Sequence, residues 1–448
     1  MEHNFLQVDG IHFKADDEKI ILRGFGIGNW LNIEHFMIGI PGSESQIRTA
    51  IAQTYGENQS SQFWEKYLHS YLGEKDFHFL SKIGVNSIRL SFNYHHFESD
   101  LTPYDYNEAG FHHIDRILSL CEKYKIYAIL DLHAAPGGQN PDWHSDNAIG
   151  EALLWEYREF QERVISLWKY IAKRYQSNQW IAGYDFLNEA CYYEPQGKIV
   201  DKFYHELVSE VRKVDKNHIF FIEGDFYANF FRNFTSYDDP NIAYSFHFYP
   251  SLFRDTNAHV NSKTQLQHIE QALFGSGELN YVLKELKRPL WCGETGINFQ
   301  RGNLEKFQSL LHDTISILEK YGISWAIWAY KDTRNMGCVR PKEESQWIRF
   351  SKLLSKDWRF GDEFKKYLIS NEVIKNLGLT HLPQNVQRKL NFRLMANEHL
   401  IRSSLFKETL VKIPFDELIT YPESFLFENC EVWEGVAEII KQFAFESK

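Results

Sequence analysis

Residues 126–133 read IYAILDLH, and residues 181–189 read IAGYDFLNE. Each stretch is a nearly continuous apolar run that ends in polar side chains. Each is followed by a loop and an amphipathic helical pattern, such as LLWEYREFQERVISLWKYIAKRY from 153. The pattern recurs in runs that begin at 21, 85, 218, 242, 288 and 323. Eight strand-and-helix repeats with apolar strands predict an α/β fold, a parallel (β/α)₈ TIM barrel over about residues 20–355.

Two further segments flank this predicted barrel. The first 25 residues alternate apolar and polar positions around Asp9-Gly10, which predicts a short N-terminal hairpin. We therefore expect a first domain over 1–355. Residues 356–448 lose the strand-and-helix alternation and contain helical patterns such as EGVAEIIKQFAF (434–445), which predict a mainly helical C-terminal extension.

Composition indicates a globular chain without a membrane span. The sequence is 43% hydrophobic and 24% charged, and no apolar stretch approaches the roughly 20 residues that a spanning helix needs. The N-terminus shows no basic start or continuous apolar segment, so a cytoplasmic location is expected. The five cysteines are odd in number and scattered, which is typical of reduced thiols rather than of a disulfide framework.

Charge and aromatic content narrow the class of partner. A formal net charge of -11 argues against nucleic acid or an anionic membrane, since both need clustered Lys and Arg. Aromatic residues reach 16%, with 12 Trp, and flat rings suit stacking on sugar faces. Large cores also consume aromatic residues, so this indication is weak by itself.

The residues that finish the eight runs form the candidate site. The carboxyl ends of parallel barrel strands meet at one mouth, so these residues should converge. They are Arg89, His133, Asn188, Glu189, His247, Tyr249, Glu294 and Trp328. Glu189 and Glu294 would face each other from the fourth and seventh strands. Opposed carboxyl groups among aromatic and hydrogen-bonding side chains suit glycoside hydrolysis, with one as acid/base and the other as nucleophile.

In this order and on these strands, the set resembles glycoside hydrolase family 5, of the large barrel clan of retaining β-glycosidases. The resemblance covers about residues 20–335. It implies that Glu189 is the acid/base and that Glu294, within LWCGETG, is the nucleophile. Asn188 would hold the 2-hydroxyl of the reacting sugar, and Trp328 would form the floor beneath it.

The other members of the set would support this pair. Arg89 would favour the ionised form of Glu294, and Tyr249 would hydrogen-bond to it. Two nearby carboxyl groups split their pKa values, so one can stay protonated at neutral pH while the other is ionised. His133 and His247 would complete the hydrogen-bonding lining.

Two loops extend the resemblance to a branch of the family. GFGIGNWLNIEHF (24–36) and DLHAAPGGQNPDWHSDN (131–147) resemble the exo-β-glucanase and β-glucosidase-like branches. Trp30, Glu34 and His144 would then build a wall that recognises a non-reducing-end sugar. Loops rich in Gly, Asn and Asp are equally typical of stabilised turns.

Other interpretations of the same residues stay open. On residue type alone, Arg89 suits a salt bridge, and the histidines and Trp328 suit the core. A metal-dependent barrel hydrolase could use Asp131, His133, His144 and His247, although no H-E-x-x-H or cysteine cluster is present. A non-catalytic sugar-binding barrel is a further alternative, and a covalent intermediate would also permit transglycosylation.

The expected activity is hydrolysis of short β-linked oligosaccharides or β-glycosides by double displacement, with exo action favoured. Glucose is the first expectation for the reacting sugar and mannose the second. An endo-β-glucanase, a mannanase or a glycolipid-directed glycosidase is the alternative within the same family. The mechanism requires no cofactor and no metal, a carbohydrate or glycoside is the expected partner, and the sequence does not determine the oligomeric state.

Overall fold

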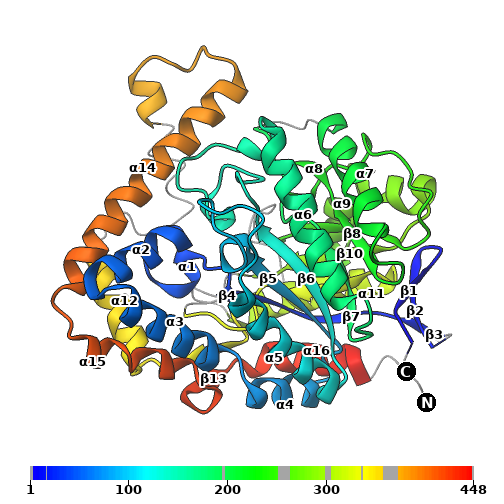
Figure 1. Ribbon diagram of the computed structural model, residues 1–448. Helices are drawn as coiled ribbons and strands as arrows, with labels where there is room; N and C mark the ends of the chain where they lie inside the picture. Colours follow the sequence, from blue (N-terminus) through cyan, green and yellow to red (C-terminus); the bar gives the residue numbers. More distant parts are fainter. Residues whose placement is uncertain are drawn as a thin grey trace.

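The computed structural model contains a closed eight-stranded barrel wrapped by helices (Figure 1). It describes residues 4–16, 18–193, 197–250, 263–297, 304–333, 336–356 and 372–445. Within these residues, no helix combines the length and the apolar character that crossing a membrane requires.

Eight parallel strands form the barrel; neighbouring strands pair in chain order from β4 to β11, and β11 closes the barrel by pairing with β4. They are β4 (Arg23–Leu31), β5 (Ser87–Asn93), β6 (Tyr127–Ala134), β7 (Ile181–Asp185), β8 (Ile219–Glu223), β9 (Ile242–Phe248), β10 (Leu290–Thr295) and β11 (Ser324–Ile327). Seven of the eight strands are buried at every residue, because helices cover the outer surface and side chains fill the interior. The predicted (β/α)₈ barrel is confirmed.

A small antiparallel sheet packs against the starts of the barrel strands. Its strands are β1 (Gln7–Asp9), β2 (His12–Ala15) and β3 (Glu18–Ile20), and the Asp9-Gly10 turn joins the first two. Leu6 and Phe13 belong to one apolar cluster with Ile129, Phe221 and Trp291 of the barrel. The sheet therefore packs on the interior at the amino ends of the strands, and the mouth at their carboxyl ends is left for polar side chains.

Helices connect the strands and cover the barrel. They are α1 (His35–Ile38), α2 (Glu44–Tyr55), α3 (Glu57–Tyr71), α4 (Glu74–Lys82), α5 (Glu108–Tyr124), α6 (Arg158–Tyr175), α7 (Lys198–Arg212), α8 (Asp225–Ala228), α9 (Lys263–Phe274), α10 (Glu278–Tyr281), α11 (Leu304–Lys320) and α12 (Gln346–Lys356). The amphipathic pattern predicted from residue 153 falls largely on α6, whose buried positions include Val164, Leu167, Trp168 and Ile171. That spacing places one apolar stripe against the sheet.

The C-terminal region is helical, as predicted, and packs along one side of the barrel. It contains α14 (Gln384–Leu410), α15 (Phe415–Leu418) and α16 (Glu434–Phe445), together with a short strand, β13 (Cys430–Val432), that pairs with β12 (Val339–Pro341). The long helix α14 runs past α2 and α1 toward the loop between β6 and α6 (Figure 1). One end of this region therefore lies near the mouth.

Candidate active site

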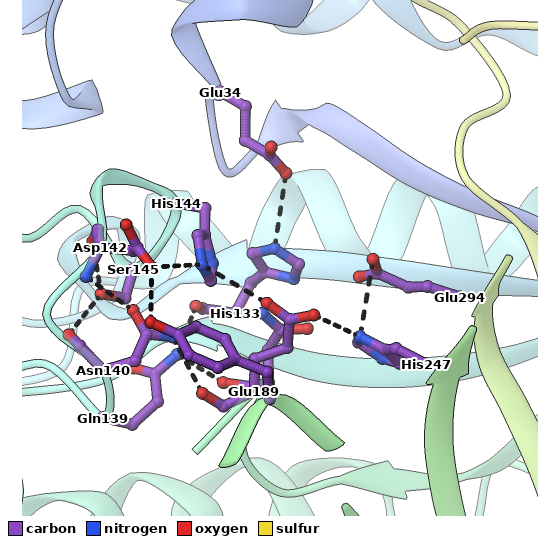
Figure 2. A network of polar contacts seen from close by, with 12 residues as sticks. Glu34, His133, Gln139, Asn140, Asp142, His144, Ser145, Glu189, His247 and Glu294 are labelled. Carbon is purple, nitrogen blue, oxygen red and sulfur yellow. Dashed lines mark hydrogen bonds and ion pairs between the residues drawn. The ribbon is translucent and has the colours of Figure 1, made fainter. Parts of the chain in front are cut away.

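The carboxyl ends of the strands bring most of the predicted residues into one network. Figure 2 shows His247 between Glu189 and Glu294, with His144 on the other side of Glu189 and Glu34 directed at His133. Ligand-type atoms of Glu189, His247 and Glu294 all lie within 4.8 Å of one another. Residues 105 positions apart in sequence, counted as 294 − 189, thus meet at one mouth.

Arg89, on β5, is the buried centre of this network. Its guanidinium donates from Nε to Asp185 Oδ2 (2.9 Å), from Nη1 to Glu294 Oε1 (2.7 Å) and from Nη2 to Glu223 Oε1 (2.8 Å). A fourth carboxylate, Asp131, lies 3.1 Å from Nη2. One permanent cation therefore holds four buried carboxyl groups, and the bidentate geometry of guanidinium suits this task.

Glu294 is fixed through both of its oxygens. Oε1 accepts from Arg89, and Oε2 accepts from the Tyr249 hydroxyl at 2.5 Å. Burial raises the pKa of Glu294, as does repulsion by Glu189, while the charges of His247 and Arg89 lower it; the net direction is upward. Neither partner exchanges a proton with Glu294 near neutral pH. Arg89 stays protonated, and burial and Glu294 itself hold the pKa of the Tyr249 hydroxyl well above its usual range, so the phenol keeps its proton.

Glu189 has a different environment from Glu294. Its backbone has a φ of 48°, an unusual value for a residue with a Cβ, and its N–H donates to Glu223 Oε2 at 2.6 Å. Its Oε1 lies 2.7 Å from His247 Nδ1, and its Oε2 lies 3.4 Å from His144 Nε2. Burial raises its pKa, but the hydrogen bond with His247 and the charges of the neighbouring histidines outweigh burial and lower the pKa of Glu189 to about 2.

The pKa values of the two glutamates shift in the opposite directions to those predicted from the sequence. The prediction was that Arg89 favours an ionised Glu294 and that Glu189 carries the proton. The structure instead surrounds Glu189 with imidazole rings. Burial opposes protonation of His247, yet Glu223, Glu294 and the hydrogen bond with Glu189 raise its pKa well above the usual range. These opposite shifts favour a proton on His247 rather than on Glu189, one hydrogen bond away.

Asn188 lies at the end of the same run as Glu189. Its Oδ1 accepts from Arg89 Nη2 at 2.9 Å, which fixes the orientation of the amide. The side chain is buried, and its Nδ2 has no hydrogen-bond acceptor among the residues that the structure describes. A buried, oriented amide donor of this kind is costly unless it serves a ligand.

Trp328 lies across the mouth beside the glycines of β4. A Cβ added at Gly26 or Gly28 would lie 2.3 Å or 2.6 Å from the indole ring, so this close approach requires glycine at both positions. The imidazole of His133 is parallel to the indole, with ring centroids 5.2 Å apart. His133 is itself oriented by Asp131, whose Oδ2 lies 2.8 Å from Nδ1, and Glu34 Oε1 lies 3.6 Å from its Nε2.

Of the three residues predicted to form a wall, the structure brings two to the network. Glu34 contacts His133, and His144 contacts Glu189. Trp30 is instead a core residue: its ring is fully buried, and Nε1–H donates to Leu68 O at 3.1 Å. The interpretation of Trp30 as a sugar-facing side chain is therefore corrected, because its position in β4 directs it into the packing against α3.

Several residues of the network were not singled out from the sequence. Asp185 and Glu223 end β7 and β8 and bind Arg89. In the loop after β6, Gln139 donates to the carbonyl oxygens of His133 and Asn188 at 2.7 and 2.8 Å, so it holds two strand ends together. Asp142 accepts from the Tyr227 hydroxyl at 2.7 Å and lies 3.8 Å from His144 Nε2.

The donors proposed for a metal-dependent hydrolase do not gather as a metal site. Within the described ranges, Asp131, His133, His144 and His247 do not share ligand distances, and Asp131 is engaged by Arg89 and His133. Glu189, His247 and Glu294 do lie close enough to offer three ligand atoms to a cation. The guanidinium 2.7 Å from Glu294 Oε1 competes electrostatically with such an ion.

A parallel barrel with two opposed glutamates held by Arg, Tyr and His at its mouth defines a glycoside hydrolase. The family model described as cellulase (glycosyl hydrolase family 5) matches residues 47–334. A protein named β-xylosidase from Phanerodontia chrysosporium is 34% identical, with 97% of each chain covered. The chain belongs to glycoside hydrolase family 5.

Other similar proteins cover the barrel but less of the chain. Endoglucanase C from Acetivibrio thermocellus is 29% identical over 61% of this chain and 88% of its own. Among solved structures, an endoglucanase from Thermotoga maritima has a TM-score of 0.52 at 18% identity, covering 73% of this chain and 93% of the other. At that identity the structural match establishes the barrel fold.

Proposed function

We propose that the protein is a retaining, exo-acting β-glycosidase that removes a single sugar from short β-linked oligosaccharides or β-glycosides. The observation that carries the proposal is the separation of the two carboxyl groups, whose oxygens approach within 4.8 Å. Retaining enzymes have carboxyl groups about 5–5.5 Å apart, whereas inverting enzymes leave about 6.5–9.5 Å for a water. The short separation favours direct attack on the sugar by one carboxylate.

In this mechanism Glu294 is the nucleophile and Glu189 the acid/base. Glu294, held by Arg89 and Tyr249, attacks the anomeric carbon while Glu189 protonates the leaving oxygen. Glu189 then takes a proton from water, which hydrolyses the covalent glycosyl-enzyme, or from a sugar acceptor in transglycosylation. His247, 2.7 Å from Glu189 Oε1, can lend Glu189 the proton for the first step and take a proton back after the second.

Asn188 and Trp328 would bind the reacting sugar. The Nδ2 amide of Asn188 is oriented by Arg89 and has no acceptor among the described residues, which suits a hydrogen bond to the 2-hydroxyl. Such a contact strengthens as the oxocarbenium-like transition state forms. The indole of Trp328, parallel to the imidazole of His133, would offer a flat ring to the sugar face.

Exo action on a β-xyloside, with a β-glucoside as the next choice, is supported by the extent of the similarity. The relative named β-xylosidase matches 97% of this chain and so includes the C-terminal region. The relative named endoglucanase C matches only 61%. A C-terminal helix close to the mouth supports a site that is closed on one side. Because the relative that matches nearly the whole chain is named β-xylosidase, xylose replaces glucose as our first expectation for the reacting sugar.

Hydrolysis of aryl β-glycosides tests the proposal. The panel comprises the xyloside, glucoside, mannoside, galactoside and cellobioside, assayed with the wild type and with Glu294→Ala in the presence of azide. We expect release of one monosaccharide by the wild type, and an inactive variant that azide rescues as the α-glycosyl azide. An α-azide product identifies the nucleophile and retention together. Glu294→Ala with near-wild-type activity without azide would contradict the assignment.

An endo-β-glucanase is the second candidate, because relatives named endoglucanase match most of the barrel. Cleavage of the cellobioside, with no cleavage of any monosaccharide glycoside, would support it. The cytoplasmic location also stays a prediction, which fractionation of the source cells followed by an activity assay checks.

A further inference from the structure

Three possible metal ligands gather on the helices α3 and α5, outside the network at the mouth (Figure 1). Glu65 and His69 lie one turn apart on α3, and His113 belongs to α5. One oxygen of Glu65 and one ring nitrogen of each histidine all lie within 4.8 Å of one another. Because residues at i and i+4 share a helix face, α3 presents a carboxylate and an imidazole together to the imidazole of α5.

The spacing within the cluster suits a tetrahedral ion. Glu65 Oε2 lies 3.3 Å from His113 Nε2, and two ligand atoms bound at roughly 2.0–2.1 Å to a tetrahedral Zn²⁺ are themselves about 3.3 Å apart. His69 would have to approach by at most about 1.5 Å, counted as 4.8 − 3.3. Its side chain is 51% exposed and that of Glu65 is 60% exposed, so rotation of these side chains can close the gap without repacking the core.

Both imidazoles are oriented by their surroundings. His69 Nδ1 lies 3.0 Å from the carbonyl oxygen of Glu65. When Nδ1 carries the proton it donates to that oxygen, and Nε2 is then the atom that can bind an ion; hydrogen bonds of this kind orient metal-binding histidines. The mostly buried ring of His113 lies edge-on to the ring of His69, with centroids 5.7 Å apart.

Solvent access and charge around the cluster permit a cation. Glu65 and His113 line a surface cavity of about 510 Å³, through which water can reach the ion as a fourth ligand. His69 lies in the last turn of α3, where the helix dipole favours positive charge. Arg116, one turn along α5 from His113, opposes a cation, but its Nη1 and Nη2 donate to two backbone carbonyl oxygens at 2.8 and 3.2 Å. Those hydrogen bonds direct the guanidinium to the backbone at the end of α3.

We propose that Glu65, His69 and His113 bind one divalent transition cation, with Zn²⁺ as the expected ion, and that this ion ties α3 to α5. Two imidazoles and one carboxylate form a ligand set that Zn²⁺ uses with water in the fourth position, whereas Ca²⁺ and Mg²⁺ require a shell of oxygen ligands. The proposal is independent of the proposed function, because the ion takes no part in the reaction at the mouth.

Zinc titration of the full chain, purified without a histidine tag and freed of metal by a chelator, tests the site. Calorimetry measures the affinity for Zn²⁺, and thermal unfolding measures the gain in Tm. We expect Tm to rise by about 3 °C when free Zn²⁺ is 100 times its Kd, because the ion binds the folded chain and a chain of this length unfolds with a large entropy. An equal gain with Ca²⁺ or Mg²⁺ would overturn the assignment of the ion.

Variants of the ligands show where the zinc binds. His69→Gln and Glu65→Gln each remove one ligand, and because both side chains are exposed the fold and the glycosidase activity should stay as in the wild type. Each variant should weaken zinc binding at least about tenfold and reduce the gain in Tm, since even the loss of a group that only orients a ligand commonly costs 10- to 100-fold in affinity. His112→Gln, at an exposed position of α5 beside His113, is the matched control and should bind zinc as the wild type does.

The glutamates and His247 at the mouth offer zinc a competing site, which inhibition of the glycosidase activity would report. Zinc that binds the wild type, His69→Gln and Glu65→Gln with the same affinity, with or without inhibition, belongs to the mouth or to an adventitious site only. That result would overturn the proposal, and so would a wild type that binds no zinc.

Discussion

Replacing Arg89 by Met should destabilise the protein by about 3–5 kcal/mol at pH 8, because it removes the one permanent cation from a buried group of carboxylates. Arg89 is fully buried and contacts Asp131, Asp185, Glu223 and Glu294 within 3.1 Å. Methionine fills a similar volume without charge. The loss would be a large part of the roughly 5–15 kcal/mol that stabilises a typical domain.

The loss in free energy of unfolding caused by Arg89→Met should grow with pH. Burial raises the pKa of Asp131, but Arg89 and His133 outweigh burial and keep it below its usual value. Without Arg89, the carboxyl pKa values in the folded state rise above those of the unfolded chain, so the folded state binds more protons. Stability then falls as pH rises through these values, and the deficit at pH 5 should be smaller than at pH 8.

Urea-induced unfolding, followed by Trp fluorescence at both pH values, measures this difference. Arg158→Met is the matched control, because the Arg158 side chain is 52% exposed and its pairs with Glu206 and Glu162 lie at the surface. Such pairs contribute about 0–1 kcal/mol. Adding Glu223→Gln to the Arg89 variant should recover part of the loss. A deficit of less than about 1 kcal/mol, or one that is equal at pH 5 and pH 8, would refute the role of the guanidinium charge.

Three further changes address the chemistry of the mouth. Asn188→Ala should lower kcat/KM roughly 100- to 1,000-fold, as expected for loss of a donor that acts in the transition state, and a 2-deoxy substrate should be affected far less. Tyr249→Phe removes a charge-assisted hydrogen bond to Glu294 and should lower kcat roughly 10- to 100-fold in steady-state assays. His144, whose pKa is lowered by burial but raised overall to about 9 by Asp142 and Glu189, is cationic at neutral pH. His144→Gln removes that charge, which raises the pKa of Glu189, so the pH profile of kcat/KM should shift to higher pH; an unchanged profile would mean that His144 carries no charge there.

The barrel and the central pair could be predicted because both depend on patterns that are local in sequence. Each strand is a short apolar run, and parallel connectivity alone places the ends of all eight runs at one mouth. Glu189 and Glu294 needed no further information to be brought together. Asp185 and Glu223 carried the same kind of signal, a carboxylate at the end of an apolar run, and the requirement that buried charges be paired would have assigned both to Arg89.

The loops and the C-terminal helix could not be predicted in the same way. Gln139 holds two strand ends through carbonyl oxygens, a role that depends on the loop conformation and leaves no periodic pattern. The contact between Phe392 and the aromatic rings near Trp143 joins segments about 250 residues apart. Trp30 could not be placed from the sequence for a different reason. Strict alternation along β4 would put it on the face of Gly26 and Gly28, beside Trp328, but the positive φ of Asn29 (58°) and the register irregularity between Ile27 and Leu31 break the alternation, and the ring lies in the core.

The environments of the two glutamates favour their assigned roles more strongly than their pKa values do. An acid/base must gain and lose a proton in each turnover, whereas a nucleophile must stay ionised until it attacks. Glu189 contacts imidazole rings through both oxygens, and a protonated imidazole, unlike a guanidinium, can pass its proton to a carboxylate and take it back. The two hydrogen-bond partners of Glu294 are a guanidinium and a phenol, which only donate hydrogen bonds to its carboxylate near neutral pH, and His247 Nδ1 lies farther away, 3.6 Å from Oε2. A low pKa of Glu189 before substrate binds is then compatible with an acid role, because His247 holds the required proton one hydrogen bond away.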